Sequence, residues 1–359
     1  MTSTTPGVVF GGPSDEHDIS ILTGLQVCHA LQDLQAFYWA KSGEWYQVSP
    51  DAEAADFVQG PPRRAKPVSL IPELGQGFVA RKPIPVGAIV NCCHGGPGED
   101  GTLQGIFDLA GVRYTGPNQA ASALGMDKFA FGAVMAAAGL PTLPRALLST
   151  GENDEPAFDG PYIVKPRFGG SSIGIEVVDD WPTALALGRS SPFYGNGGVV
   201  EPFMPDSRDL QLAVRTWPGL ELSAIEAPIR SGGGIYSYNQ KYLAWGGEVS
   251  GGRELPARLD PPVEVRLRDL AREVAVVAGL RGVCRIDFLE TNGQVWVNEV
   301  NTIPGSMGAY LWIDPPISRP ALFRAMVEEA LASPSRRFST AGADGTALKN
   351  AGSISNKLG

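Results

Sequence analysis

The sequence has few of the residues on which transition-metal and disulfide sites depend. Only three histidines and four cysteines occur among its 359 residues. Two of the cysteines, Cys92 and Cys93, are adjacent, and none of the four has the spacing of metal ligands. This scarcity argues against a histidine-rich metal centre. The cysteines are typical of buried thiols in a reducing compartment, so we expect a cytoplasmic protein.

Long apolar runs and an excess of positive charge are also missing. No stretch approaches the roughly 18 apolar residues of a membrane-spanning helix. The N-terminus, MTSTTPGVVFGG, has neither the basic start nor the apolar segment of a signal peptide. The net charge of −9 and the pI near 5.0 argue against a nucleic-acid or membrane partner. Basic residues that bind anions must therefore act locally.

Hydrophobic periodicity predicts an α/β unit followed by mixed helices and strands. GVVF (7–10) is an expected strand, and Ser14 or Asp15 can cap the helix that follows it. Residues 51–87 and 230–256 are expected to be mainly irregular, and the polar residues after Ser333 to be mobile. Further strands are expected at 88–94, 162–166, 175–178, 199–203, 210–217, 220–227 and in the last hundred residues. Further helices are expected at Leu103–Ala110, after Asn118, from Asp127 to Gly139, and at 263–279 with Leu267, Leu270, Val274 and Val277 on one face.

The segment GGPGEDG (95–101) matches the pattern G-x-G-x-x-G between a strand and a helix, the context of a dinucleotide-binding turn. Two features argue against that function. Glu99 and Asp100 would face a pyrophosphate that carries the same sign of charge. No strand ending in an acidic residue lies about 20 positions further on, as ribose recognition requires. The sequence therefore disfavours a nicotinamide- or flavin-dependent oxidoreductase.

Two predicted strands, CRIDFLE and VWVNEVN, carry the strongest local chemistry. Side chains alternate along a strand, so Arg285 and Asp287 share one face, as do Glu299 and Asn301. If the loop between the strands has an odd length centred on Gly293, Asp287 lies opposite Glu299, with Cβ atoms about 5 Å apart.

Two carboxylates separated by so short a distance repel each other unless a cation lies between them. With an amide oxygen they form a hard-oxygen set that suits Mg²⁺ shared with substrate phosphates. The alternative is a surface hairpin whose acids make one ion pair with Arg285. Apolar neighbours indicate a half-buried sheet, where uncompensated acids are costly, and this favours the metal site.

Two lysines are candidates for binding an anion. Lys128 lies in the first turn of a helix, where the dipole disfavours a cation, so it either faces an anionic ligand or is solvated. Lys165 precedes the glycine-rich loop of VKPRFGGSSIG. With the N–H groups from Gly169 to Ser172 it makes a plausible phosphate cradle, unless it is an ordinary edge lysine. The loop is not a Walker sequence, because the lysine comes before the glycines.

Together these pieces resemble the D-alanine–D-alanine ligase family within the ATP-grasp enzymes. The resemblance implies a three-domain ATP-grasp fold of α/β and α+β units. The expected divisions are an N-terminal domain at 1–117, a central domain at 118–197, a C-terminal domain at 198–335 and a flexible tail at 336–359. The matching segments follow the family's order from about residue 7 to 312: FGGPSDEHDIS, HGGPGEDGTLQG, YTG, MDK, VKPRFGGSSIG, VEPF…RDL, QKY, PAR, RIDF and NEVNTIPG.

The resemblance also implies which residues bind the nucleotide. Lys128 and Lys165 match phosphate-binding lysines, and Glu201 matches an acid on the adenine side. Asp209 stands where the family usually has a ribose-binding glutamate. The other expected ATP contacts are Gly169, Gly170, Ser172, Phe203 and Met204. Asp287, Glu299 and Asn301 match ligands of Mg²⁺, with two ions expected and Mn²⁺ as a possible substitute.

On the amino-acid side, Glu16 matches the residue that holds the first amino acid's ammonium group. Ser171 and Tyr242 match its partners in a network that closes a mobile loop, to which Lys241 also belongs. Arg285 and the backbone of Gly305 match the group that stabilises the oxyanion. His94, Lys241, Tyr310 and Leu311 are further expected substrate contacts.

The implied reaction is attack of a carboxylate on the γ-phosphate of ATP, followed by attack of an amine on the acyl phosphate. The leading interpretation is the joining of two D-alanines for the cell wall, by an enzyme whose family is commonly dimeric. Tyr310 departs from the family, which usually has a carboxylate-binding serine there. Tyr310 and Trp312 either alter the acceptor site or pack in the core. A ligase with a different amine acceptor in a specialised pathway is thus the alternative. A nucleotide-binding protein without ligase activity fits less well, because every charged residue needed for phosphoryl transfer is present.

Overall fold

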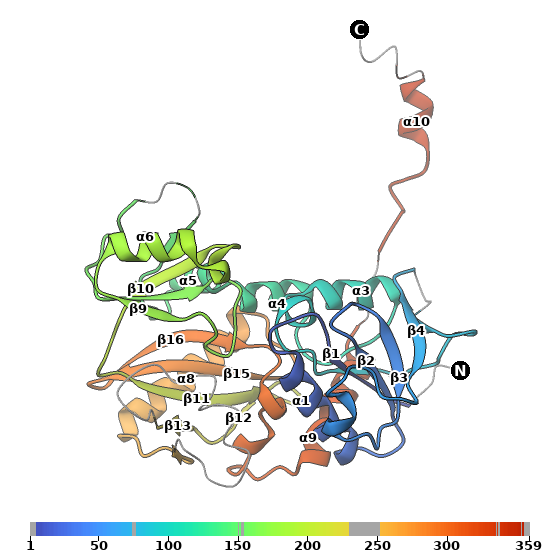
Figure 1. The fold of residues 1–359 in the computed structure, drawn as a ribbon, viewed down its shortest axis with the longest axis horizontal. Helices are drawn as coiled ribbons and strands as arrows, with labels where there is room; N and C mark the ends of the chain where they lie inside the picture. The colour runs from blue at the N-terminus through green and yellow to red at the C-terminus, as the bar shows by residue number, and fades with distance from the viewer. Residues whose placement is uncertain are drawn as a thin grey trace.

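The computed structural model describes residues 5–73, 77–149, 151, 154–229, 252–334, 336, 338–352 and 354. Three larger sheets organise the body of the molecule (Figure 1). The N-terminal sheet lies at the right of the view, the sheet that carries β9 and β10 at the upper left, and the sheet of β11, β15 and β16 below it. Among the described residues no helix is both long and apolar enough to cross a bilayer.

The N-terminal sheet has six strands in the order β5-β4-β3-β2-β1-β6. β1 pairs in parallel with β2 and β6, and the strands from β2 to β5 form an antiparallel meander. The sequence pattern indicated only β1 and β6, because β2 is buried on both faces and shows no alternation. The bounds are β1 (Gly7–Gly11), β2 (Gln35–Trp39), β3 (Trp45–Val48), β4 (Lys66–Ile71), β5 (Gly77–Val79) and β6 (Ile89–Asn91).

Helices α1 (His17–Ala30), α2 (Gly96–Glu99) and α3 (Thr102–Ala110) belong to this unit, with the short η1 (Ala54–Phe57). The prediction that Ser14 or Asp15 caps α1 is wrong, because Glu16 occupies the cap position and makes no side-chain capping bond. The Ser14 hydroxyl donates instead to the carbonyl of His94, at 2.7 Å. The glycine segment at 95–101 is largely helix α2, so it does not form an open dinucleotide-binding turn. All four cysteines are buried thiols, as expected.

The second sheet has the order β7-β10-β8-β9, and β8 pairs antiparallel with β9 on either side of the glycine-rich loop, as predicted. Side chains of Asn118 and Asp127 cap helices α4 and α5, also as predicted. β10 lies between β7 and β8, so a division after residue 197 would separate this strand from its sheet. The bounds are β7 (Ala146–Leu148), β8 (Tyr162–Pro166), β9 (Glu176–Val178), β10 (Gly198–Pro202), α4 (Gln119–Met126), α5 (Lys128–Ala137), α6 (Trp181–Ser190) and η2 (Pro192–Tyr194).

The third sheet has the order β12-β11-β15-β16 and shares an apolar core with α8. Leu267, Leu270 and Val274 of α8 are buried, whereas Val277 is 38% exposed, contrary to expectation. Val277 lies at the edge of the apolar stripe, where the helix ends. The expected strand at 220–227 is mostly irregular. The bounds are β11 (Arg208–Arg215), β12 (Glu221–Leu222), β13 (Ala227–Pro228), β14 (Arg253–Glu254), β15 (Val283–Thr291), β16 (Gln294–Asn301) and α8 (Pro261–Val277).

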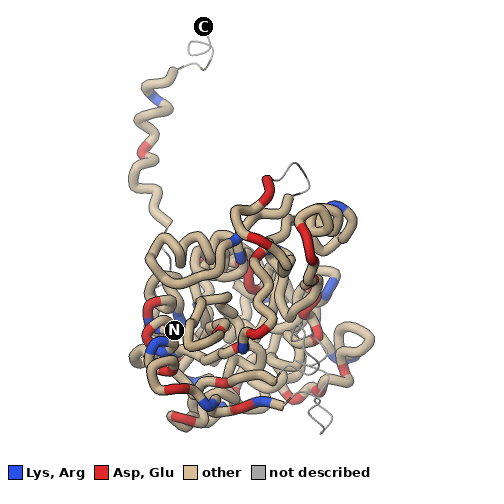
Figure 2. The backbone as a smooth tube through the Cα atoms, turned by 90° about the vertical axis from the view of Figure 1, so that its left-hand side faces the viewer, with Lys and Arg blue, Asp and Glu red and all other residues tan. Residues whose placement is uncertain are grey.

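Helix α9 (Arg319–Ala332), which follows the third sheet in the chain, returns to the N-terminal unit. Its residues Leu322, Phe323 and Met326 join one apolar cluster with Val8 and Val90. The 3-10 segment η4 (Gly305–Leu311) contributes to the same cluster and so ties the first unit to the third. Beyond α9 the chain leads away from the body to the short helix α10 (Thr346–Ala351), which buries no residue (Figure 2). The sequence did not predict this helix.

Candidate active site

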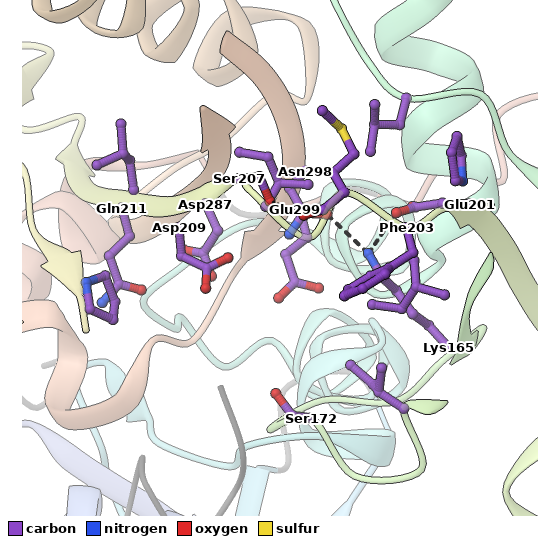
Figure 3. Close-up of a pocket in the computed structure, with 18 residues that line it drawn as sticks. Lys165, Ser172, Glu201, Phe203, Ser207, Asp209, Gln211, Asp287, Asn298 and Glu299 are labelled. Atoms are coloured by element: carbon purple, nitrogen blue, oxygen red, sulfur yellow. Dashed lines mark hydrogen bonds and ion pairs between the residues drawn. The ribbon is translucent and has the colours of Figure 1, made fainter. Parts of the chain in front are cut away.

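A cavity lies between the second and third sheets, and residues from β8, β10, β11, β15 and β16 line it. Apolar side chains such as Ile163, Leu210 and Leu289 alternate with polar ones. Asp209, Asp287 and Glu299 extend into the same space, with Ser172 from the glycine-rich loop across from them (Figure 3). The predicted ATP and metal contacts that line this cavity are Lys165, Ser172, Glu201, Phe203, Met204, Asp209, Asp287 and Glu299.

A buried charge network holds Lys165 at the base of this cavity. Its Nζ donates to Glu201 Oε2 at 2.6 Å and to Asn298 Oδ1 at 3.2 Å. Arg145 Nε lies 2.8 Å from the other carboxylate oxygen of Glu201. Burial alone would raise the pKa of Glu201, but Lys165 and Arg145 outweigh burial and hold that pKa below its usual value. Sequence reasoning missed Arg145, because no distinguishing pattern surrounds it in the chain.

The β15–β16 hairpin brings the predicted metal ligands together. Asp287 is the partner of Glu299, and Arg285 is the partner of Asn301, as predicted. Asn292-Gly293 forms the turn, as its sequence indicated, but the odd-length loop on which the pairing was conditional is absent: the turn has two residues, with Thr291 opposite Gln294. A bulge between Asp287 and Phe288 shifts the register by one residue and restores the expected pairs.

The hairpin carboxylates are balanced by cations. Arg285 Nε and Nη2 donate to the two oxygens of Asp287, each at 2.7 Å, and Asn301 Nδ2 donates to Asp287 Oδ2 at 3.1 Å. Lys128 Nζ lies 3.3 Å from Glu299 Oε2 and also donates to the carbonyl of Gly169. The ion pair between Arg285 and an acid, which the alternative of a surface hairpin predicted, is thus present. The hairpin, however, belongs to a half-buried sheet that lines a cavity.

These residues fit a hard divalent cation by the chemistry of their donors. In the described part of the chain, no three His, Cys, Asp or Glu residues gather as a metal cluster. The predicted set contains only two carboxylates, Asp287 and Glu299, and the amide oxygen of Asn301 completes it. A set of this composition binds Mg²⁺ when substrate phosphates and water supply the remaining oxygens.

A second cavity, of about 470 Å³, lies beside the first and falls within the range of small-molecule sites. Glu299 and Gln211 line both cavities. The second cavity also contains Glu16, His94, Lys128, Gly169, Gly170, Ser171, Arg285, Asn301, Gly305 and Tyr310, all of them predicted site residues.

Glu16 lines this cavity and joins two loops. The Ser171 hydroxyl donates to Glu16 Oε1, as the predicted network requires. A Cβ atom at Gly170 would come within 2.5 Å of Glu16 Oε2, and one at Gly95 within 2.6 Å. A side chain added at either position would therefore displace the Glu16 carboxylate from its place between the loops. Tyr242 and Lys241, also predicted here, lie outside the described residues.

Two buried titratable groups next to Glu16 shape the cavity. His94 Nε2 is 2.8 Å from Thr23 Oγ1, and burial lowers the pKa of His94 to about 4, so the imidazole is neutral. Glu99 accepts from the backbone N–H groups of Gly95 and Ile303 at 2.9 and 2.8 Å. Burial, with a contribution from Glu16, raises the pKa of Glu99 to about 7. No pattern in the sequence indicated this role for Glu99.

A second group of polar residues that line this cavity surrounds Tyr310. Gln211 Nε2 donates to Glu226 Oε2 and lies 3.4 Å from the Tyr310 hydroxyl. The guanidinium of Arg253 lies over the Tyr310 ring, 5.4 Å from its centroid. Burial raises the pKa of Tyr310, so the phenol stays neutral. Sequence reasoning missed Gln211, Glu226 and Arg253, because the fold alone brings them together.

The side chain of Tyr310 lines the cavity, whereas those of the next two residues, Leu311 and Trp312, do not. The expectation that Leu311 contacts substrate is wrong for its side chain, which is fully buried in the apolar core. Trp312 is also buried, with Arg215 above its ring, so it is a packing residue. Both follow from the 3-10 turn η4, which directs Tyr310 to the cavity and Leu311 to the core.

Comparisons with known proteins agree with this geometry. The D-ala D-ala ligase N-terminus family matches residues 5–117, and the D-ala D-ala ligase C-terminus family matches residues 134–328. The D-alanine–D-alanine ligase of Mycobacterium bovis is 33% identical, over 90% of this chain and 95% of its own.

Solved structures share the fold. The D-alanine–D-alanine ligase from Coxiella burnetii has a TM-score of 0.78 and 23% identity, covering 92% of this chain and 95% of its own. The VanG D-Ala:D-Ser ligase from Enterococcus faecalis has a TM-score of 0.74 and 24% identity, covering 91% and 99%. With both family domains matched in order along an ATP-grasp fold, this chain belongs to the D-alanine–D-alanine ligase family.

Proposed function

We propose that this protein joins two D-alanine molecules in an ATP-dependent reaction that passes through an acyl phosphate. The observation that carries the proposal is the meeting of two cavities at Glu299 and Gln211. The first contains the lysine and carboxylates suited to a nucleotide and its metal. The second contains charged groups suited to amino acids. A carboxylate in the second can thus reach a phosphate in the first.

The proposed roles follow from charge and position. Glu16 binds the ammonium group of the first D-alanine and leaves its carboxylate directed toward Glu299. Lys128 and Lys165 offset the negative charge that develops on the transferring phosphoryl group. Mg²⁺ held by Asp287, Glu299 and Asn301 supplies further charge compensation when bound. Arg285 and the N–H of Gly305 stabilise the oxyanion formed as the amine attacks.

The remaining nucleotide contacts are proposed from their place in the first cavity. We assign Glu201 and Met204 to the adenine, Phe203 to the wall beside it and Asp209 to the ribose, since all four line the first cavity. Ser172 and the N–H groups of Gly169 and Gly170 contact phosphate. His94 contacts substrate as a neutral group. We also propose two metal ions, Mn²⁺ as a substitute, and a homodimer in the cytoplasm.

A second candidate is ligation to a different amine. Tyr310 motivates it, because a bulky phenol lines the cavity where the family pattern has a small hydroxyl residue. The same fold occurs in a protein described as a D-Ala:D-Ser ligase, so the fold alone does not decide the acceptor.

Release of ADP with ATP and Mg²⁺, measured across D- and L-amino acids, tests the proposal. We expect release with D-alanine alone, together with D-alanyl-D-alanine. Release that requires D-alanine and a second, different amine would favour the other candidate. No amino-acid-dependent release with any substrate would contradict both and leave a nucleotide-binding protein.

A further inference from the structure

One ion pair in the second cavity has no part in the roles given above. Glu226 Oε1 lies 3.5 Å from Arg253 Nη1. The other acidic residues that line this cavity in the described ranges are already engaged. Glu16 is bonded to Ser171, Glu99 to Gly95 and Ile303, and Glu299 to Lys128, while Arg285 holds Asp287. Glu226 and Arg253 are therefore the oppositely charged pair left for a second substrate.

The backbone fixes Glu226 in relation to the phosphoryl-transfer site. Gln211 and Glu226 exchange two backbone hydrogen bonds, at 2.9 and 2.8 Å, and Gln211 lies opposite Asp287 across β11 and β15. Asp287, Gln211 and Glu226 thus lie side by side on three neighbouring segments. Two strand spacings separate Asp287 from Glu226, about 10 Å.

The surroundings of Glu226 and Arg253 suit a ligand that carries both charges. Glu226 is only 3% exposed, yet it borders the cavity, and Gln211 orients its carboxylate. The Arg253 side chain is 50% exposed, and its 3.5 Å separation from Glu226 exceeds a charge-assisted hydrogen bond of about 2.8 Å. A zwitterion can therefore insert its ammonium group at Glu226 and its carboxylate at Arg253 without breaking a tight pair.

We propose that Glu226 and Arg253 bind the acceptor amino acid, Glu226 through its ammonium group and Arg253 through its carboxylate. The proposal rests on the ligase function proposed above and adds the class of acceptor. The acceptor is an α-amino acid, because both charges are needed. The ring of Tyr310 lies against the Arg253 guanidinium and so forms one wall of this acceptor site.

The test is a steady-state measurement that separates the two D-alanine sites. ADP release is followed at saturating ATP over a wide range of D-alanine, and two KM values are fitted. Glu226→Gln keeps the shape of the side chain but removes its charge. We expect the second KM to rise about 10- to 100-fold, the loss of one charged hydrogen bond. The first KM and the KM for ATP should change less than about twofold.

Arg253→Met gives an independent test, because this half-exposed side chain can be changed with little risk to folding. It should raise the second KM for D-alanine to a similar degree. With D-alaninamide as acceptor, which has no carboxylate, Arg253→Met should have no effect. The matched controls are Glu221→Gln and Arg208→Met, which change ion-paired residues of the same sheet outside both cavities and should leave both KM values unchanged.

The outcomes distinguish this inference from the function on which it rests. If the wild-type protein releases no ADP with D-alanine, the proposed function fails. If the wild type is active but both variants keep the second KM within about twofold, the acceptor assignment is overturned. A parallel rise of both KM values would also overturn the acceptor assignment, because it would show that Glu226 and Arg253 have only a structural role.

Discussion

At the scale of single residues, the proposed chemistry depends most on Glu299, which borders both cavities and faces Asp287. Glu299→Gln removes a charge from the proposed metal set with almost no change in shape. We expect ADP release to fall by about 10²-fold or more, because one group that stabilises developing charge is lost. Steady-state kinetics at saturating Mg²⁺ measures the loss.

Glu290→Gln is the matched control for that change. Glu290 lies on the same hairpin and pairs with Arg208 at 2.9 Å, but it lines neither cavity. Its variant should keep near-normal activity. Near-normal activity of Glu299→Gln would contradict the metal assignment.

Glu99 gives a prediction about pH. Its pKa in the folded protein is about 7, above its ordinary value of 4.5, because it is buried next to Glu16. The folded state therefore holds the proton more tightly than the unfolded state. The stability that this provides is complete below pH 4.5 and is lost as pH rises through 7, up to about 3 kcal/mol.

Urea unfolding of the wild type and Glu99→Gln between pH 5 and pH 8 measures this effect. The variant cannot ionise at this position. The wild type should lose free energy of unfolding relative to the variant as pH rises, whatever the offset between them at pH 5. A constant difference across this range would show that Glu99 does not titrate there.

The sequence predicted single residues best where the chain itself brings them close. Lys165 and the glycine-rich loop, or Asp287 and Glu299 on one hairpin, are near in sequence and could be placed from periodicity alone. Arg145, Gln211 and Glu226 could not be placed so, because each reaches its site by the packing of separate strands. Leu311 was assigned from the resemblance alone, and the 3-10 turn η4 directs its side chain into the apolar core instead.

At the scale of elements, the β15–β16 hairpin shows how a correct pairing can come from a wrong loop. The pairing of Asp287 with Glu299 was expected on the condition of an odd-length loop centred on Gly293, whereas the structure has a two-residue turn and a bulge that adds the extra residue. Bulges have no residue signature strong enough to be recognised in one sequence. Asn298, the extra residue, contacts Lys165 and Arg145, so the bulge also ties the hairpin to the second sheet.

Gly293→Ala tests the importance of this turn. Gly293 has φ of +81°, a conformation that costs a residue with a Cβ about 1–2 kcal/mol. The nearest atom to an added Cβ is 4.0 Å away, so no clash contributes. We expect urea unfolding to show a loss of that size. Gly219→Ala is the control, since Gly219 has no positive φ and open space around it.

An equal loss for the two variants would mean that the left-handed conformation at Gly293 does not matter. A loss confined to Gly293→Ala would show that the hairpin carrying Asp287 and Glu299 depends on its turn.

At the scale of the whole molecule, the units are more interlocked than a sequence division indicates. The helix α9 packs on β1 and β6 although it follows the third sheet in the chain, and β10 completes the second sheet. Contacts between segments so far apart in the chain produce no local pattern in the sequence from which they could be predicted. The three-unit architecture could be inferred from the resemblance, but not where the chain crosses between units.

The described part of the C-terminal tail, unlike α9, is not packed into the body of the molecule. Between Phe338 and Gly352 every described residue except Gly345 and Ala351 is exposed, and none is buried. A chain that ends at Phe338 should therefore keep its thermal midpoint and its rate of ADP release within experimental error. A large loss of activity would show that the tail contributes to the site or to assembly.

The central claim is that a D-alanine carboxylate attacks the γ-phosphate of ATP where the two cavities meet. In this reaction one oxygen of that carboxylate leaves with the phosphate when the amine displaces it. D-alanine labelled with ¹⁸O in its carboxylate, turned over with ATP, tests this directly by mass spectrometry of the released phosphate. We predict one ¹⁸O atom in each phosphate. Phosphate without the label, or label in AMP, would contradict the claim.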